Sequence, residues 1–115
     1  MLDSTRGSVV GEQIRVADGV WSRFWGLLGD SSLAPGAGLL LNPSQGVHTI
    51  GMRFGIDVVF LSDDLRVVGL RERLKPFRMT SLNWRSACVL ELPLGTLRSC
   101  RIEMDDQFVI EPAAG

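Results

Sequence analysis

The sequence predicts a mainly β fold of the α+β type: a small closed or partly closed β-barrel, with one or two short helices covering an opening. Two observations lead to this prediction. Short apolar runs are separated by turn-forming residues at frequent intervals, which favours a barrel or sandwich over βαβ units. The hydrophobic fraction of 45% and the charged fraction of 22% are ordinary for a globular protein, and 115 residues suit one domain. We therefore expect a single domain over residues 1–115, with its core between about residues 8 and 111.

The first part of the chain is predicted to form a strand and then a helix. Apolar and polar residues alternate across residues 8–17, as they do in a strand with one buried face. Asp18 is a suitable helix N-cap, and Gly29 is a suitable stop. Between them, four apolar side chains recur at helical spacing: Trp21, Phe24, Trp25 and Leu28. The helix over residues 18–28 is the one expected to cover an opening of the barrel.

Two long apolar runs predict the central strands of the sheet. Residues 56–61, IDVVFL, are interrupted only by Asp57, which is typical of a strand buried on both faces. A short connection, SDDL, leads from it to a returning strand over residues 66–74. Residues 87–92 form the second run, which is also interrupted by one acid, Glu91.

Shorter elements complete the prediction. A buried strand is expected over residues 38–41, and a last strand over residues 107–111. A single helical turn is expected over residues 96–100, with Thr96 as its N-cap.

Asp57 is the most informative residue of the stretch HTIGMRFGIDVVFL. A carboxylate within an apolar strand must be paired, hydrogen-bonded or protonated, because an uncompensated buried charge is costly. Arg53, four residues earlier on the same face, or Arg23 from the predicted helix could supply the partner. One interpretation is a structural ion pair at the mouth of the barrel. The other makes Arg53 an anion-binding fork that Asp57 orients.

Charge and motif content argue against several classes of function. The formal net charge of −1 gives no global case for nucleic-acid binding, although half of the 12 basic residues lie within residues 66–85. His48 is the only histidine and has no second ligand at metal-binding spacing, and the two cysteines lack C-x-x-C spacing. We therefore predict no metal and no cofactor.

The first residues do not resemble a signal peptide, and no apolar run approaches the ~18 residues that span a bilayer. We expect a soluble cytoplasmic protein.

Three separated blocks of the sequence resemble one protein family. The blocks read Arg23-x-x-Gly26-Leu27-Leu28, then His48-Thr49-x-Gly51-Met52-Arg53-Phe54-x-Ile56-Asp57-Val58-Val59-Phe60-Leu61, then Leu90-Glu91-Leu92-Pro93-x-Gly95-Thr96. In this order they are similar to a family of small bacterial and archaeal proteins known as domain of unknown function number one hundred ninety-two. The resemblance covers roughly residues 8–111.

The resemblance implies a compact β-barrel with short helices and a biochemical role that is not established. It places five residues at the polar positions of the family motifs: Arg23, Thr49, Arg53, Asp57 and Glu91. His48 matches one variant of the motif. The chain departs from the family at three positions. The family usually has proline at Gly55, often has glycine at Leu65, and has a Gly-Asp pair where Asp105-Asp106 stands.

Three functional hypotheses follow. The one ranked first is a binding domain with a pocket at the barrel mouth for a small polar or anionic ligand, lined by Arg23, His48, Thr49, Arg53, Asp57 and Glu91. The second is a hydrolase-like enzyme that uses Asp57 and Glu91 as an acid/base pair, although no nucleophile or phosphate-loop motif supports it. The third is an interaction module that contacts an anionic partner through residues 66–85. The sequence alone does not decide whether the protein is an enzyme, or its oligomeric state.

Overall fold

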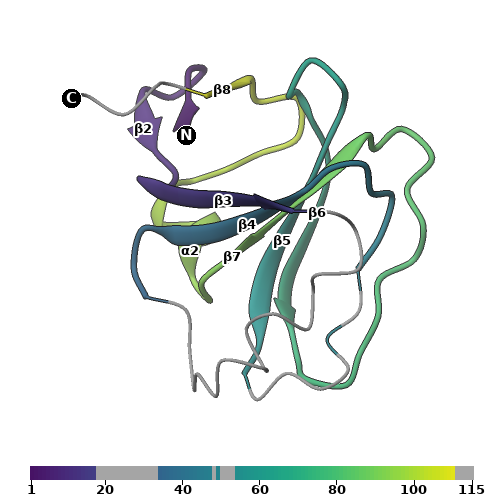
Figure 1. The fold of residues 1–115 in the computed structure, drawn as a ribbon. Helices are drawn as coiled ribbons and strands as arrows, with labels where there is room; N and C mark the ends of the chain where they lie inside the picture. Colours follow the sequence, from purple (N-terminus) through teal and green to yellow (C-terminus); the bar gives the residue numbers. More distant parts are fainter. Residues whose placement is uncertain (18–33, 48, 50–53, 111–115) are drawn as a thin grey trace.

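A computed structural model describes residues 1–17, 34–47, 49 and 54–110, and the following account concerns these residues. They form two β-sheets and one short helix (Figure 1). The elements are β1 Leu2–Asp3, β2 Ser8–Val9, β3 Gln13–Ala17, β4 Ala37–Leu41, β5 Ile56–Leu61, β6 Val67–Leu74, β7 Cys88–Leu92, α2 Thr96–Ser99 and β8 Phe108–Val109. The mainly β class is therefore confirmed.

The larger sheet has five strands in the order β3-β4-β7-β5-β6. Strands β3 and β4 are parallel, and the other neighbours are antiparallel. The two predicted apolar strands, β5 and β7, lie side by side in its interior (Figure 1). Within the described residues no ladder joins the edge strands β3 and β6, so the expected barrel closure is not confirmed.

Each face of the large sheet carries its own apolar cluster. Across β5 and β7, Val58 lies opposite Glu91, and Asp57 lies opposite Leu92. Successive side chains of a strand point to opposite faces, so these two pairs face opposite sides of the sheet. All six residues of β5 are buried, because clusters cover both of its faces, as the apolar run predicted. One cluster includes Val58, Phe60 and Val89, and the other includes Val59, Leu61 and Leu90.

The small sheet, with the order β2-β1-β8, joins the start of the chain to its last described strand. Residues 8–17 were predicted as one strand but divide into β2 and β3. The break is at Val10 and Gly11, whose amides donate to Met1 O at 3.0 and 3.4 Å. The chain there leaves the small sheet, and Gln13 N joins the large one by donating to Gly36 O at 2.9 Å.

Two predicted element boundaries need correction, and one predicted helix cannot be assessed. The last strand is shorter than residues 107–111, covering Phe108–Val109. The N-cap of α2 is Gly95, in a left-handed conformation with φ of 89°, and not Thr96. The Thr96 hydroxyl donates to Pro93 O at 2.7 Å, so it serves the turn before the helix. The helix predicted over residues 18–28 lies outside the described residues.

Two of the positions at which the sequence departs from the resembled family adopt a conformation suited to glycine. Leu65 has φ of 67° and Asp105 has φ of 70°, both in the left-handed region that is unfavourable for residues with a Cβ atom. Both residues lie in turns, Leu65 between β5 and β6 and Asp105 before β8. The turn geometry is therefore formed without the glycine and carries conformational strain.

We predict that Asp105→Gly stabilises the fold by about 0.5–1 kcal/mol. Relief of left-handed strain, ~1–2 kcal/mol, exceeds the entropy cost of a new glycine, ~0.5–1 kcal/mol. The main-chain bonds of Asp105 to Val67 and Arg66 do not need its side chain. Urea unfolding measures the change, with the exposed Asp63→Gly as a control that should lose stability. An equal decrease in the free energy of unfolding in Asp105→Gly and Asp63→Gly would contradict the prediction.

Candidate functional site

Asp57 is fully buried and its carboxylate is a junction for three main-chain amides. Its Oδ1 accepts a hydrogen bond from Arg73 N at 3.0 Å. Its Oδ2 accepts from Gly95 N and Leu97 N, both at 3.0 Å. The sequence suggested an arginine side chain as the partner, but these three bonds all come from backbone N–H groups. Charge-assisted bonds of this kind compensate the burial of a carboxylate.

The three amides belong to segments whose backbones need support. Arg73 lies where β6 bulges against β5, and it is left-handed with φ of 55°. Gly95 and Leu97 begin α2, where the first amides of a helix have no intrahelical acceptor. Asp57 therefore fixes both the end of β6 and the turn that leads from β7 into α2.

Thr49 is the second fully buried polar residue of the predicted site. Its hydroxyl donates to Lys75 O at 2.6 Å and accepts from Arg78 N at 2.9 Å. Its own main chain exchanges two further bonds with the same segment, from Thr49 N to Arg78 O at 2.7 Å and from Phe77 N to Thr49 O at 3.0 Å. Thr49 therefore holds the chain that follows β6, as Asp57 holds the end of β6 itself.

A cleft of about 360 Å³ opens where these two anchored segments meet. We call it the Arg73–Lys75 cleft; it is lined by Gly55, Arg73, Lys75, Pro76, Leu94 and Gly95. Among the described residues, the lining contains two exposed cationic residues and no acidic residue. Asp57 binds the main chain of Arg73 and Gly95, and Thr49 binds the main chain of Lys75. Two buried polar residues thus position the cationic wall of the cleft.

The remaining predicted site residues do not all join this cleft. Glu91 is fully buried, but the strand register directs it to the face opposite Asp57. The two carboxylates therefore lie on opposite faces of the sheet, and this register does not support the acid/base pair proposed from the sequence. Arg23, His48 and Arg53 lie outside the described residues.

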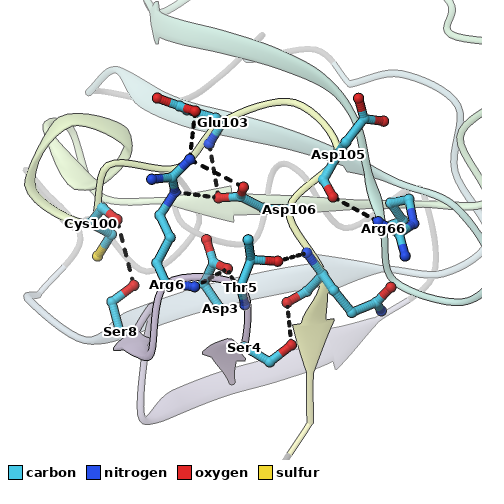
Figure 2. A network of polar contacts seen from close by, with 11 residues as sticks. Asp3, Ser4, Thr5, Arg6, Ser8, Arg66, Cys100, Glu103, Asp105 and Asp106 are labelled. Atoms are coloured by element: carbon cyan, nitrogen blue, oxygen red, sulfur yellow. Dashed lines mark hydrogen bonds and ion pairs between the residues drawn. The ribbon is translucent and has the colours of Figure 1, made fainter.

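A second polar network joins the two ends of the described chain (Figure 2). Arg6 Nε donates to Asp106 Oδ2 at 2.8 Å, and Arg6 Nη2 lies 2.5 Å from Glu103 Oε2. Asp3 Oδ1 accepts from the amides of Thr5 and Arg6 at 3.1 and 3.3 Å. Asp3 and Asp106 are both buried, and both lie beside Arg6 (Figure 2).

This arrangement shifts the pKa values of the two acids in opposite directions. Burial, together with the hydrogen bond and negative charge of Asp106, raises the pKa of Asp3 from 3.8 to about 6. Burial alone would also raise the pKa of Asp106, but hydrogen bonds from Asp3 and Arg6 lower it. The second oxygen of Asp3 is buried and has no hydrogen-bond partner among the described residues.

The sequence analysis missed two features of this surface. Arg73 and Lys75 were interpreted as part of a basic segment, and only the bulge at Arg73 brings them beside Gly95. The Asp3–Arg6–Asp106 network joins residues that are about one hundred positions apart, so local patterns carry no signal for it. The acidic character of the tail was visible, but its partner at Arg6 was not.

Some conventional sites are absent from the described part of the chain. It holds no group of three or more His, Cys, Asp or Glu side chains arranged for a metal ion. Cys88 and Cys100 are both free, and burial raises the pKa of the Cys88 thiol. No helix in the described part of the chain is long and apolar enough to cross a bilayer.

Together, the fold and cleft define a small, mainly β domain with two sheets, one short described helix and a cationic surface cleft. The chain belongs to the DUF192 family, described as Uncharacterized ACR, whose model matches residues 2–110. A UPF0127 protein of Pyrococcus furiosus is 31% identical over 111 residues, which cover 94% of this chain and 95% of that protein. A UPF0127 protein of Thermococcus sibiricus is 27% identical over 116 residues, which cover 94% of this chain and 72% of that protein.

Two solved structures share the fold. A protein of unknown function from Novosphingobium aromaticivorans has a TM-score of 0.68 and 16% identity, covering 87% of this chain and 78% of that one. A protein from Sinorhizobium meliloti, described as a candidate transcription regulator, has a TM-score of 0.66 and 23% identity, covering 82% and 78%. At these identities the similarity establishes the fold alone.

The carboxyl pair predicts an unusual pH dependence of stability. Because the folded pKa of Asp3 lies above its model value, its charged form is disfavoured by folding, and its contribution to stability falls as pH rises from about 4 through about 6. Asp106 has the opposite sign, and its contribution is lost only as pH falls through its lowered folded pKa.

Asp3→Asn should imitate the protonated acid, since its amide can donate to Asp106 while its oxygen still accepts from Thr5 and Arg6. We expect it to raise stability at pH 7 by about 1–3 kcal/mol and to remove the decline between pH 4 and pH 7. Urea unfolding at several pH values measures both effects, with Asp63→Asn as the control. Lower stability of Asp3→Asn at pH 7 would contradict the assignment.

Proposed function

We propose that this domain binds a small anionic ligand in the Arg73–Lys75 cleft. One observation carries the proposal: two fully buried polar residues, Asp57 and Thr49, hold the main chain of both cationic residues that line it. The described lining places these two cations at one opening with no acid beside them, an arrangement that suits an anion.

Physical considerations favour an anion of modest size. A volume of about 360 Å³ falls within the range of small-molecule sites, ~300–1,000 Å³. Arg73 can form a planar, bidentate contact with a carboxylate or phosphate, and Lys75 adds a compact point charge. Pro76 and Leu94 provide apolar surface for the remainder of an organic ligand. Anchored main chains reduce the ordering cost of binding.

The residues of the family motifs take different roles in this proposal. Thr49 and Asp57 are positioning residues, because their polar groups are buried and bonded to the backbone. Arg23, His48 and Arg53 remain proposed ligand contacts, as in the binding hypothesis drawn from the sequence. We propose no catalytic step, because Glu91 lies on the other face of the sheet from Asp57.

The test uses the fact that Lys75 is the only lysine in the sequence. Reductive methylation with ¹³C-formaldehyde labels Lys75 and the N-terminal amine, which give separate methyl signals. Titration with inorganic phosphate, and separately with a small dicarboxylate, should shift the Lys75 methyl signal saturably. The N-terminal signal is the internal control.

Variants locate the effect. Arg73→Gln should weaken the response of Lys75 at least about tenfold, the effect of losing one hydrogen-bonded charge. Arg101→Gln is a matched control, because Arg101 is also exposed and left-handed, with φ of 53°, but does not line the cleft. An unsaturable Lys75 response to both anions, or equal effects of the two substitutions, would refute the proposal.

A further inference from the structure

Large apolar side chains project from the segment that follows the cleft. We define the apolar ridge as Phe77, Met79, Leu82 and Trp84, whose exposed fractions are 64%, 67%, 60% and 77%. Soluble proteins rarely expose large apolar side chains in close succession, and where they do, the exposed surface commonly marks an interaction site. Four such residues within eight positions therefore indicate an interaction surface. The other strongly exposed apolar residues of the described chain are scattered over several elements.

The ridge is built on a fixed main chain. Thr80 N donates to Val47 O at 2.9 Å, and Asn83 N donates to Gln45 O at 2.8 Å. The Asn83 side chain donates to Val68 O at 3.1 Å, which ties the same segment to β6. In Figure 1 the segment between β6 and β7 runs along one side of the molecule. The apolar side chains are therefore held outward by the fold.

The charges around the ridge have one sign. From Arg73 to Leu90 the sequence contains four basic residues and no acidic residue, although the whole chain has a net charge of −1. Arg78 and Arg85 are exposed and flank the ridge residues, and neither lines the Arg73–Lys75 cleft. Arg71 and Arg85 also line a shallow groove of about 490 Å³ beside Leu82 and Trp84. The rest of the chain has more acidic than basic residues.

We propose that the apolar ridge docks on an anionic lipid bilayer, with its apolar side chains in the interfacial region and Arg78 and Arg85 at the headgroups. Aromatic and aliphatic side chains combined with cations are the composition of interfacial membrane-binding surfaces. Side chains that protrude by more than half of their area suit insertion into a soft layer better than seating in a protein pocket.

Other partners fit the ridge less well. Met79 and Leu82 offer no face for base stacking, which non-specific binding of single-stranded nucleic acid uses. A second copy of the chain docked ridge to ridge would bring its basic residues against those of the first, and like charges oppose that contact. An anionic bilayer matches both the charge and the apolar character.

Sedimentation with lipid vesicles tests the proposal on the full chain. We expect binding to vesicles rich in phosphatidylglycerol and none to vesicles of phosphatidylcholine alone. Trp84 reports insertion, so the emission should shift to shorter wavelength on binding, and Trp84→Phe should remove that shift. Arg78→Gln and Arg85→Gln should each weaken partitioning about fivefold. A double variant, Phe77→Ser with Trp84→Ser, should weaken it more.

Matched controls are Ile110→Ser and Arg101→Gln, which change exposed residues outside the ridge and should leave vesicle binding unchanged. The proposal is overturned by failure to bind anionic vesicles, or by binding that the ridge variants do not reduce. It is also overturned if Trp84 drives dimer formation, or if the ridge binds heparin or RNA without shifting the Trp84 emission on vesicles. Because Arg78 and Arg85 lie outside the cleft, their variants should keep the response of Lys75 to phosphate, which separates this proposal from the binding function.

Discussion

The carboxylate of Asp57 is the interaction on which the rest of the surface depends. It binds the amides of Arg73, Gly95 and Leu97, which come from the end of β6, the turn after β7 and the first turn of α2. These segments lie 16 to 40 residues from Asp57 in the sequence, and no ladder of the large sheet holds Gly95 or Leu97 in place. One buried side chain therefore links two irregular connections to the central strand β5.

Thr49 extends the same principle to the chain beyond β6. Through Lys75 and Arg78 it anchors the beginning of the segment that carries the apolar ridge, and Val47 and Gln45 anchor its continuation. The buried polar side chains thus fix the main chain of exposed charged and apolar residues. Burial of a polar side chain is costly unless its hydrogen bonds are made. In the proposed function, Thr49 and Asp57 therefore act as positioning residues, whereas the sequence analysis predicted that they would line the ligand pocket.

The predictability of each feature depends on how local its cause is. Strand β5 was predicted with its observed bounds, because its six-residue apolar run needs no distant information. The sequence also predicted that the Asp57 carboxylate needs a hydrogen-bonding partner. The three described donors are backbone amides from distant segments, which only the folded chain brings together. The Thr96 cap was wrong because Gly95 adopts a left-handed conformation and begins the helix. The closed or partly closed barrel was inferred from strand spacing and from the family resemblance, and neither decides whether β3 and β6 pair.

Amide hydrogen exchange in the Asp57→Asn variant tests the central role of this carboxylate most directly. The amides of Arg73, Gly95 and Leu97 should be well protected in the wild-type protein, because a buried acceptor holds each of them. In Asp57→Asn, where the amide group offers one acceptor atom and places a donor in the same space, all three should exchange faster, while the β5–β7 ladder keeps more of its protection. Asp63→Asn should change none of them. Unchanged protection of the three amides, or a uniform loss across the whole sheet, would contradict the account.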